Sequence, residues 1–249
     1  MGMKRTLFLP RSPLIGIDIS HTYLKCMAMD TAKWHVSCYG STNADPQKLR
    51  TSLTESPDYL ISLLRDLTSK NMVGNFAGSQ AIVSLPTNLT YSRSVSIPKA
   101  AIKKIDESIA LEASQYIPVA LSELNLSYEV LSETDQSIDV LMAAAPKRII
   151  DNIFTACLEV GLTPLAVQPS INAVAKLITS TEQGHLPTVI VDIGAANTDV
   201  AILNERIRAT ASVQVGSNTL TYAISEKMGV SLEAAHQLKV LHGLSHGTK

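Results

Sequence analysis

Two aspartates stand at the ends of short apolar runs, and each is followed by a turn of small and polar residues. Asp18 ends LIGID and precedes ISHT, while Asp192 ends VIVD and precedes IGAANT. A tight turn between two strands presents backbone N–H groups, as the nests that hold phosphate groups do. Mg²⁺ binds through one or two carboxylates together with phosphate oxygens and water. Asp18 and Asp192 therefore predict a site for a magnesium ion and a nucleotide.

The two aspartates belong to an internal echo in the sequence. Leu14–Asp30 and Thr188–Asn204 share one plan, in which an apolar run, an aspartate and a polar turn with a threonine lead into a second alternating run. This pattern predicts a β-hairpin in each copy. The distance between the copies is far too long for a solenoid repeat. It favours a duplicated domain that opens each time with the same hairpin.

A simpler interpretation assigns each aspartate to its own turn. Asp often closes a turn through an Asx-type hydrogen bond, with no ligand involved. The repetition of the whole pattern favours the shared site over this interpretation. Lys25, seven residues after Asp18, is placed to reach a phosphate. A lysine on a strand also serves as a solvated edge charge, so its role stays open.

The rest of the chain alternates between helical and extended patterns. Apolar spacing and end signals predict helices over Asp58–Lys70, Ala100–Tyr116, Lys147–Val160, Ile171–Thr181 and Ser217–Met228, and a further helix after Ser231. Short strands are predicted over Ala81–Pro86, Ser137–Pro146 and Leu162–Ser170. This alternation predicts an α/β protein with mixed sheets flanked by helices.

Composition narrows the classes of partner. The net charge of -1 and the pI near 6.6 provide no basic footprint for nucleic acid and no polybasic membrane patch. We expect no direct membrane span, because every apolar run is shorter than the ~18 to 20 residues that a span needs. The start, MGMKRTLFLPRSP, is interrupted by Pro10 and makes a poor signal peptide. Three widely separated cysteines are typical of reduced thiols, so a cytoplasmic location is expected.

The two hairpin sequences carry a family resemblance. LIGIDISHTYLK and VDIGAANTDVAIL resemble the two phosphate loops of the actin, sugar-kinase and heat-shock-chaperone superfamily. The resemblance implies duplicated actin-like domains of the ribonuclease H-like kind that bind ATP with Mg²⁺. It assigns cofactor binding to Asp18, Ser20, His21, Thr22, Lys25, Asp192, Gly194, Ala195 and Thr198, and the metal to Asp18 and Asp192. QPSINAVAKLI resembles the helix that connects the halves, and Gln168 falls where active members position the hydrolytic water.

A longer segment narrows the resemblance to one family. Ile97–Leu131, with the run EASQYIP, resembles the corresponding segment of PilM, the actin-like protein of type IV pilus machines. The tail from Val215 onward is similar to PilM and to the division protein FtsA. The resemblance implies a first actin-like domain over residues 14–170 with an inserted α+β subdomain at about 85–136. Residues 171–249 would hold the connecting helix and a partial second domain.

The inserted segment is also the candidate for partner binding. In the PilM family, the groove beside this insert takes the N-terminal cytoplasmic segment of the inner-membrane protein PilN. The resemblance thus implies a PilN-like partner, and further components of the pilus motor. From the residues alone, a helix, an extended edge and a corner at Pro118 make a shape that accepts a short peptide. An amphipathic helix packed on its own sheet explains the same pattern.

Two departures from the family bear on nucleotide binding. Ser20 replaces the usual glycine of the first loop, and Ala195 and Ala196 replace the glycine-rich step of the second. Methyl groups at these positions limit how closely the backbone approaches a phosphate. The family also continues past the last residue here, through the turn that grips adenosine. We therefore expect an incomplete second domain, with weak or absent nucleotide binding by this chain.

The sequence does not contain a recognisable set of catalytic residues. The histidines are scattered, and the spacing of His242 and His246 alone supplies too few ligands for a metal site. We expect a non-enzymatic scaffold. One alternative is an ATPase or kinase of the same superfamily that uses Asp18 or Asp192 with Mg²⁺. A second alternative is an FtsA-like cell-division protein.

Overall fold

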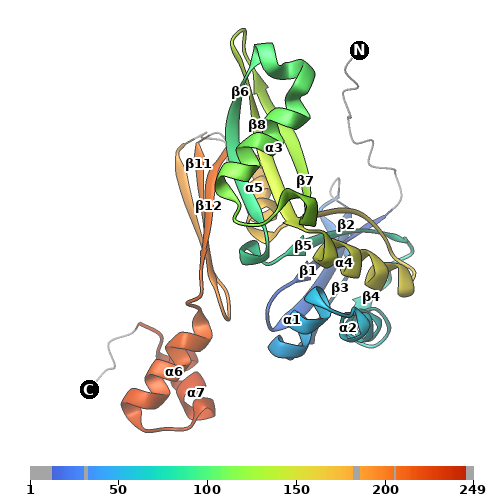
Figure 1. Cartoon of the computed structure of the whole chain (residues 1–249). Coiled ribbons are helices and arrows are strands. Elements are labelled where there is room, and N and C mark those ends of the chain that lie inside the picture. Colours follow the sequence, from blue (N-terminus) through green and yellow to red (C-terminus); the bar gives the residue numbers. More distant parts are fainter. Residues whose placement is uncertain (1–12, 31–32, 182–185, 205, 245–249) are drawn as a thin grey trace.

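The fold consists of two six-stranded sheets flanked by helices (Figure 1). The computed structural model describes residues 13–30, 33–181, 186–204 and 206–244. Helices and strands alternate along most of this length, so the predicted mixed α/β fold is confirmed.

The first sheet is built around the N-terminal hairpin. Its order is β4 (Met72–Gly74), β3 (His35–Asn43), β2 (Tyr23–Asp30), β1 (Leu14–Ile19), β5 (Gln80–Leu85) and β9 (Thr163–Pro169). The strands β1 and β2 pair antiparallel, as the alternating pattern predicted, whereas β5 pairs parallel with both β1 and β9. The strand β9 is therefore an outer edge of this sheet.

Three helices cover one face of the first sheet: α1 (Pro46–Thr54), α2 (Asp58–Ser69) and α4 (Lys147–Glu159). Asp45 caps α1 by accepting hydrogen bonds from the amides of Gln47 and Lys48. A leucine stripe on α2 packs against the buried side chains of the strands, among them Ile15, Ile17 and Leu24. The strand residues between them face the opposite side of the sheet, because side chains alternate along a strand.

The second sheet joins elements that are far apart in sequence. Its order is β10 (Thr188–Ile193), β11 (Thr198–Asn204), β12 (Arg206–Val213), β6 (Tyr91–Pro98), β8 (Ser137–Pro146) and β7 (Leu124–Glu133). The junction between β12 and β6 is short, with the pair Ala209 and Arg93 in register. The hydroxyl of Thr210 strengthens it by donating to the carbonyl of Ser92 at 3.1 Å. The second hairpin is thus fastened to β6.

One helix packs across the strands β6, β8 and β7 of the second sheet. The helix α3 (Ile105–Tyr116) covers a core that includes Ile97, Ile138 and Met142. The predicted helix from Ala100 differs at its start, where the structure has the 3-10 helix η2 (Lys99–Lys104). Two further 3-10 turns, η1 (Thr87–Leu89) and η3 (Leu121–Glu123), precede β6 and β7.

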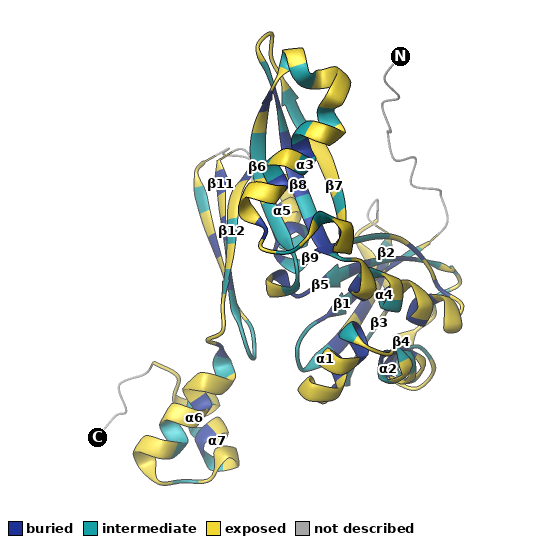
Figure 2. Cartoon of the chain, viewed as in Figure 1, coloured by how far each residue is buried: buried dark blue, intermediate teal, exposed yellow. Residues whose placement is uncertain are grey.

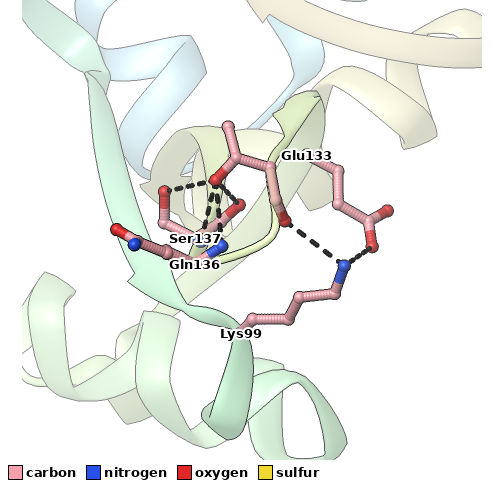
Figure 3. Close-up of polar contacts among 5 residues, drawn as sticks. Lys99, Glu133, Gln136 and Ser137 are labelled. Carbon is pink, nitrogen blue, oxygen red and sulfur yellow. Dashed lines mark hydrogen bonds and ion pairs between the residues drawn. The ribbon is translucent and has the colours of Figure 1, made fainter.

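The turn between β7 and β8 is closed by polar contacts (Figure 3). The hydroxyl of Thr134 accepts from the amides of Gln136 and Ser137. The ammonium of Lys99 lies 3.2 Å from a Glu133 carboxylate oxygen, and the Lys99 amide donates to the Gln136 carbonyl. The start of η2 is therefore tied to the tip of this hairpin.

The helix α5 (Ser170–Thr181) covers one face of the second hairpin. Ile171 and Ala175 pack there against Ile190, Ala201 and Leu203. The opposite face of β10, β11 and β12 is exposed over a run of large apolar side chains, which are Val189, Val191, Ile193, Ile202 and Val213. Figure 2 shows exposed positions along β11 and β12.

Two helices complete the described chain. The helices α6 (Ser217–Met228) and α7 (Leu232–His242) pack as a hairpin at the end of β12, away from the other helices in Figure 1. Gly229 has a φ of 64°, which suits glycine and ends α6, and Ser231 caps α7. In the described ranges, every helix falls short of the length and apolar character needed to cross a membrane.

Candidate functional site

A cleft of about 1000 Å³ lies between the two hairpins. The uncovered face of the first sheet forms one wall, and α5 and the turn of the second hairpin form the other. Seven of the nine predicted cofactor residues line it, namely Asp18, Ser20, His21, Lys25, Asp192, Gly194 and Ala195. Thr22 and Thr198 are outside the lining. The structure therefore brings the two aspartates of the echo to one cavity.

The pairing registers reveal an acid that the sequence reasoning missed. Asp18 pairs with Lys25 in the first hairpin, and Asp192 pairs with Asp199 in the second. Asp199 thus occupies the position in the second hairpin that Lys25 occupies in the first. Extending the echo from the first strand of each hairpin to the second strand would have found it, since both residues follow their aspartate by seven positions.

The carboxylates are close enough to influence one another. Burial and the neighbouring carboxylates of Asp199 and Asp18 raise the pKa of Asp192 above its ordinary value, while Lys25 acts in the opposite direction. Asp18 accepts a hydrogen bond of 2.5 Å from the hydroxyl of Ser84 on β5. The partner seen for Asp18 is therefore on the neighbouring strand and not in its own turn.

Asp199 is the centre of a hydroxyl network. It is 9% exposed, and it accepts from the hydroxyl of Ser212 at 2.5 Å and from that of Ser170 at 3.5 Å. The Ser170 hydroxyl lies 3.2 Å from the hydroxyl of Thr87 in η1, and the side-chain amide of Asn197 donates to Ser212. Asp199 thereby links the second turn to α5 and, through Ser170, to η1.

The first turn uses some of its own amides. The Ser20 hydroxyl accepts from the backbone amides of Thr22 and Tyr23, at 3.3 Å each. His21 faces η1, where its Nε2 lies 3.1 Å from the side-chain oxygen of Asn88. The Lys25 ammonium lies 4.4 Å from the centre of the Tyr23 ring, a cation–π distance. The hydroxyl of Ser20 therefore occupies amides that a bound anion would otherwise use.

The second turn is tied to the start of α6. Its Gly194 and Ala195 carbonyls accept from the amides of Ser217 and Asn218, at 2.9 Å each. The first amides of a helix are a common anion site, but these two already have partners. The hydroxyl of Thr198 donates to the carbonyl of Val215 at 2.7 Å, so it braces the same junction.

The carboxylates of the cleft could hold a divalent cation only together with ligands from outside the protein. In the part of the chain that the structure describes, His, Cys, Asp and Glu side chains form no group of three placed to hold a metal ion. A cation would therefore depend on one or two carboxylates, with phosphate and water oxygens completing its shell. Asp18 and Asp192 remain the predicted ligands. His185 and His246 lie outside the described residues.

A second cavity of about 250 Å³ lies between the two sheets. Its floor is formed by small residues of β7 and β8, among them Ser127, Ala143 and Ala145. The helix α4 contributes Ile150 and Phe154, and β9 contributes every residue from Leu165 to Pro169. We call this cavity the β9 groove. Pro118, where the sequence suggested a peptide corner, is not part of its lining.

Gln168 belongs to both cavities. It lines the cleft on one side and the β9 groove on the other, and it pairs in register with Ser84, which bonds Asp18. This position places the glutamine at the boundary between the two candidate sites.

Comparisons with known proteins agree with this architecture. The cell division protein FtsA of Neisseria meningitidis serogroup B is 19% identical over 187 residues, covering 73% of this chain and 43% of FtsA. The chain thus spans less than half the length of that relative. Among solved structures, the PilM-PilN type IV pilus biogenesis complex matches with a TM-score of 0.78 and 20% identity, over 94% of this chain and 71% of that chain.

A second solved structure is similar at a lower level. It is the cytoplasmic domain of EpsL, an inner-membrane component of the type II secretion system of Vibrio cholerae. It matches with a TM-score of 0.51 and 11% identity, over 88% of this chain and 78% of that chain. These likenesses confirm the actin-like fold. The model of the type IV pilus assembly protein PilM matches residues 16–248, and this chain therefore belongs to the PilM family.

Proposed function

We propose that this chain is a cytoplasmic scaffold of type IV pilus assembly that binds the N-terminal cytoplasmic segment of a PilN-like inner-membrane protein. The β9 groove is the observation that carries this proposal. It lies beside the proposed inserted segment and is lined by apolar and small side chains, and among its lining residues only Gln168 also lines the cleft with the aspartates. Binding such a partner would hold the chain at the inner membrane.

The composition of the groove supports a peptide ligand. The residues that line it carry no charge, and Leu126, Phe154 and Leu165 offer apolar walls. A floor of alanine and serine leaves room for a main chain to approach closely. Pockets of this kind gain affinity from apolar side chains, with a few polar groups fixing the orientation.

In this proposal the cleft has a structural role. Asp18, Asp192 and Lys25 would hold a Mg²⁺–ATP complex between the hairpins, and the bound nucleotide would brace the two halves. The engaged amides of both turns argue for modest affinity. Mg²⁺ would offset the negative charge of the neighbouring carboxylates.

Binding of a labelled PilN-like N-terminal peptide, followed by fluorescence anisotropy with and without Mg²⁺–ATP, tests the scaffold role. Ala143→Leu fills the floor of the groove and is expected to weaken binding by about tenfold or more, equivalent to about 1.4 kcal/mol. Ala211→Leu is the matched control, because Ala211 is an exposed strand residue on β12, outside the groove lining. Absence of binding in both conditions would remove the proposal.

An enzymatic role has its own test. If the chain were an ATPase or a kinase supplied with its acceptor, it would convert ATP to ADP, and Asp192→Ala would abolish that conversion. We expect no turnover above the background of the Asp192→Ala variant, with peptide binding retained in both proteins.

A further inference from the structure

We propose that the turn between β2 and β3 contacts the membrane directly, with Trp34 inserted among the headgroups of a bilayer that contains anionic phospholipids. This surface lies at the end of the first sheet opposite to the turn with Ser20, because β1 and β2 run antiparallel. The proposal therefore goes beyond the binding of a PilN-like segment and does not depend on it. It would give the chain a second, weaker hold on the membrane at which such a partner would recruit it.

The first argument is the exposure of an aromatic side chain on a turn. Trp34 is the single tryptophan of the chain, and it is 71% exposed. Val36, two residues further on, is 41% exposed. Tryptophan combines a large apolar ring with one N–H donor, so it is enriched where an apolar region meets a wet one, as at the two interfaces of a membrane.

The second argument is the backbone at this position. Trp34 has a φ of 51°, and among the described residues it is the only one other than glycine with a positive φ. A bulky side chain is unfavourable in this left-handed conformation, which glycine or asparagine adopts more easily. Such strain persists where the surroundings enforce it, and it is common at functional sites. The turn therefore keeps a tryptophan where folding alone would favour a smaller residue.

The surroundings hold the turn in place. The register of β2 and β3 shifts so that Ser37 is an extra residue on β3, which makes a β-bulge. The hydroxyl of Ser37 donates to the carbonyl of Ala28 at 3.1 Å, and the carbonyl of Ser37 accepts from the amide of Asn75. A Cβ on Gly74 would collide with that same carbonyl. A turn that is fixed in advance loses little conformational freedom when it binds.

A lipid surface fits this turn better than a protein pocket does. Stable protein interfaces bury about 1,000 Å² or more, whereas the turn offers only the large apolar side chains of Trp34 and Val36. A single indole ring can enter the headgroup region of a bilayer without a matching shape on the other side, and this is where tryptophans of membrane proteins gather.

The charges at this end of the sheet favour anionic headgroups. Lys33 is exposed on the turn, and its amide donates to the carboxylate of Asp30 at 3.2 Å. The pairing of Ile15 with Ala28 brings the start of β1 to the same end. The twelve residues that precede Pro13 contain no acidic residue and three basic ones, which are Lys4, Arg5 and Arg11. Basic residues near a membrane surface are attracted to anionic lipids. The net charge of the chain is -1, so this attraction is local.

The fluorescence of the native tryptophan tests the insertion without a label. Vesicles of equal parts phosphatidylglycerol and phosphatidylcholine are added to the chain. Because Trp34 is the single tryptophan, its emission is expected to shift to shorter wavelengths as the ring leaves water, and bromine-labelled acyl chains are expected to quench it. Vesicles of phosphatidylcholine alone are expected to produce a weaker shift at the same lipid concentration.

A pair of variants tests the side chain in co-sedimentation with the same anionic vesicles. Trp34→Gly suits the left-handed backbone, so the variant keeps the fold, and it is expected to weaken vesicle binding by about tenfold or more. Leu111→Ala is the matched control, because Leu111 is 64% exposed on α3 beside the second sheet. Its binding to vesicles is expected to equal that of the parent chain.

The outcomes separate a membrane contact from a protein contact. Absence of a shift with the anionic vesicles, or vesicle binding by Trp34→Gly equal to that of the parent, would overturn the proposal. Equal binding to both kinds of vesicle would overturn the preference for anionic headgroups. A shift caused by the PilN-like peptide and not by vesicles would mean that the turn docks a protein. The vesicles contain no protein, so each of these results leaves the scaffold role to the peptide-binding assay.

Discussion

At the scale of single residues, the cleft gathers three carboxylates and one ammonium around the two turns. Asp192 is the member whose pKa is raised, because burial and the charges of Asp199 and Asp18 disfavour its ionised form. The native chain therefore holds a proton on Asp192 more tightly than the unfolded chain does. Below the ordinary pKa of 3.8 the group is protonated in both states and has no effect on stability. Stability is lost as the pH rises from there through the raised pKa.

Asp192→Asn is expected to raise the melting temperature at pH 7 by a small amount, since asparagine has no charge to desolvate or to be repelled by Asp199 and Asp18. The gain is small because Asp192 is exposed and solvent screens its charge. The gain should shrink as the pH falls toward 3.8, where the aspartate is itself neutral. Thermal unfolding followed by circular dichroism over this pH range measures both effects. Asp151→Asn on the exposed side of α4 is the control, and an equal gain from it would count against the explanation.

The three thiols are expected to be unreactive in the folded chain. Cys26, Cys38 and Cys157 are buried, and burial raises the pKa of Cys26 and of Cys157 to about 11. Cys38 adds to the rise at Cys26. Since the thiolate is the reactive form, Ellman's reagent at pH 8 should label almost nothing until denaturant is added, and then three thiols per chain. Rapid labelling of one thiol in the native protein would contradict the burial.

The sequence predicted which aspartates share the cleft, but it did not predict their surroundings. Asp18 and Asp192 could be matched because apolar runs and small turns are local patterns. Asp199 and Ser84 were missed because their roles depend on strand register, which pairs Asp199 with Asp192 and Ser84 with Asp18. The binding assignments of the nine predicted residues remain predictions, with Thr22 and Thr198 placed outside the cavity lining.

At the scale of elements, the second turn and the start of α6 form one unit. A side chain on Gly216 would bring its Cβ to 2.6 Å from the carbonyl oxygen of Ala195, which is a backbone atom and cannot move freely. The hydrogen bonds from Ser217 and Asn218 to this turn require the same close approach. Glycine is needed here for space rather than for an unusual φ.

Gly216→Ala is therefore expected to destabilise the chain by about 1–3 kcal/mol, the usual cost of forcing extra volume into a packed site. Gly16→Ala is the matched control, because its Cβ would lie 3.6 Å from the nearest atom, the Met27 carbonyl oxygen. Urea unfolding of both variants compares them. Equal free energies of unfolding for the two variants would mean that the turn and α6 can move apart without a loss of stability.

The amphipathic helices were the easiest elements to predict. In α2 and α4, buried leucines and isoleucines recur at helical spacing, and the observed bounds differ from the predicted ones by a residue. The strand β3 was not predicted, because HVSCYGSTN has a single fully buried position and owes its form to pairing with β2. Strand propensity depends strongly on such neighbours.

At the scale of the whole molecule, the two hairpins are equivalent in sequence but not in burial. Ile19 and Ile193 each follow the aspartate of their hairpin, yet Ile19 is 1% exposed under the helices and Ile193 is 63% exposed. Val189 and Val191 share the exposed face of β10. The pairing of the second hairpin with β6 could not be predicted, since the contact of β12 with β6 spans over a hundred residues.

The matched pair Ile19→Ala and Ile193→Ala tests this difference. Ile19→Ala is expected to cost about 2–5 kcal/mol through a cavity in the core. Ile193→Ala should stay within about 0.5 kcal/mol of the parent, as exposed substitutions do. Chemical denaturation measures both, and similar losses would show that the outer face of β10 is covered in solution. Binding of an apolar dye should fall only in the Ile193→Ala protein.

The first hairpin has Lys25 where the second has Asp199, so the two walls of the cleft differ in charge. Hairpins related by duplication would present equal walls, and a ligand could enter such a cleft either way round. Here one wall carries an aspartate with a lysine, and the other carries two aspartates. The broken symmetry leaves one wall neutral and the other anionic when all four groups are ionised. A ligand with a phosphate at one end and a cation at the other thus has a single preferred orientation in the cleft.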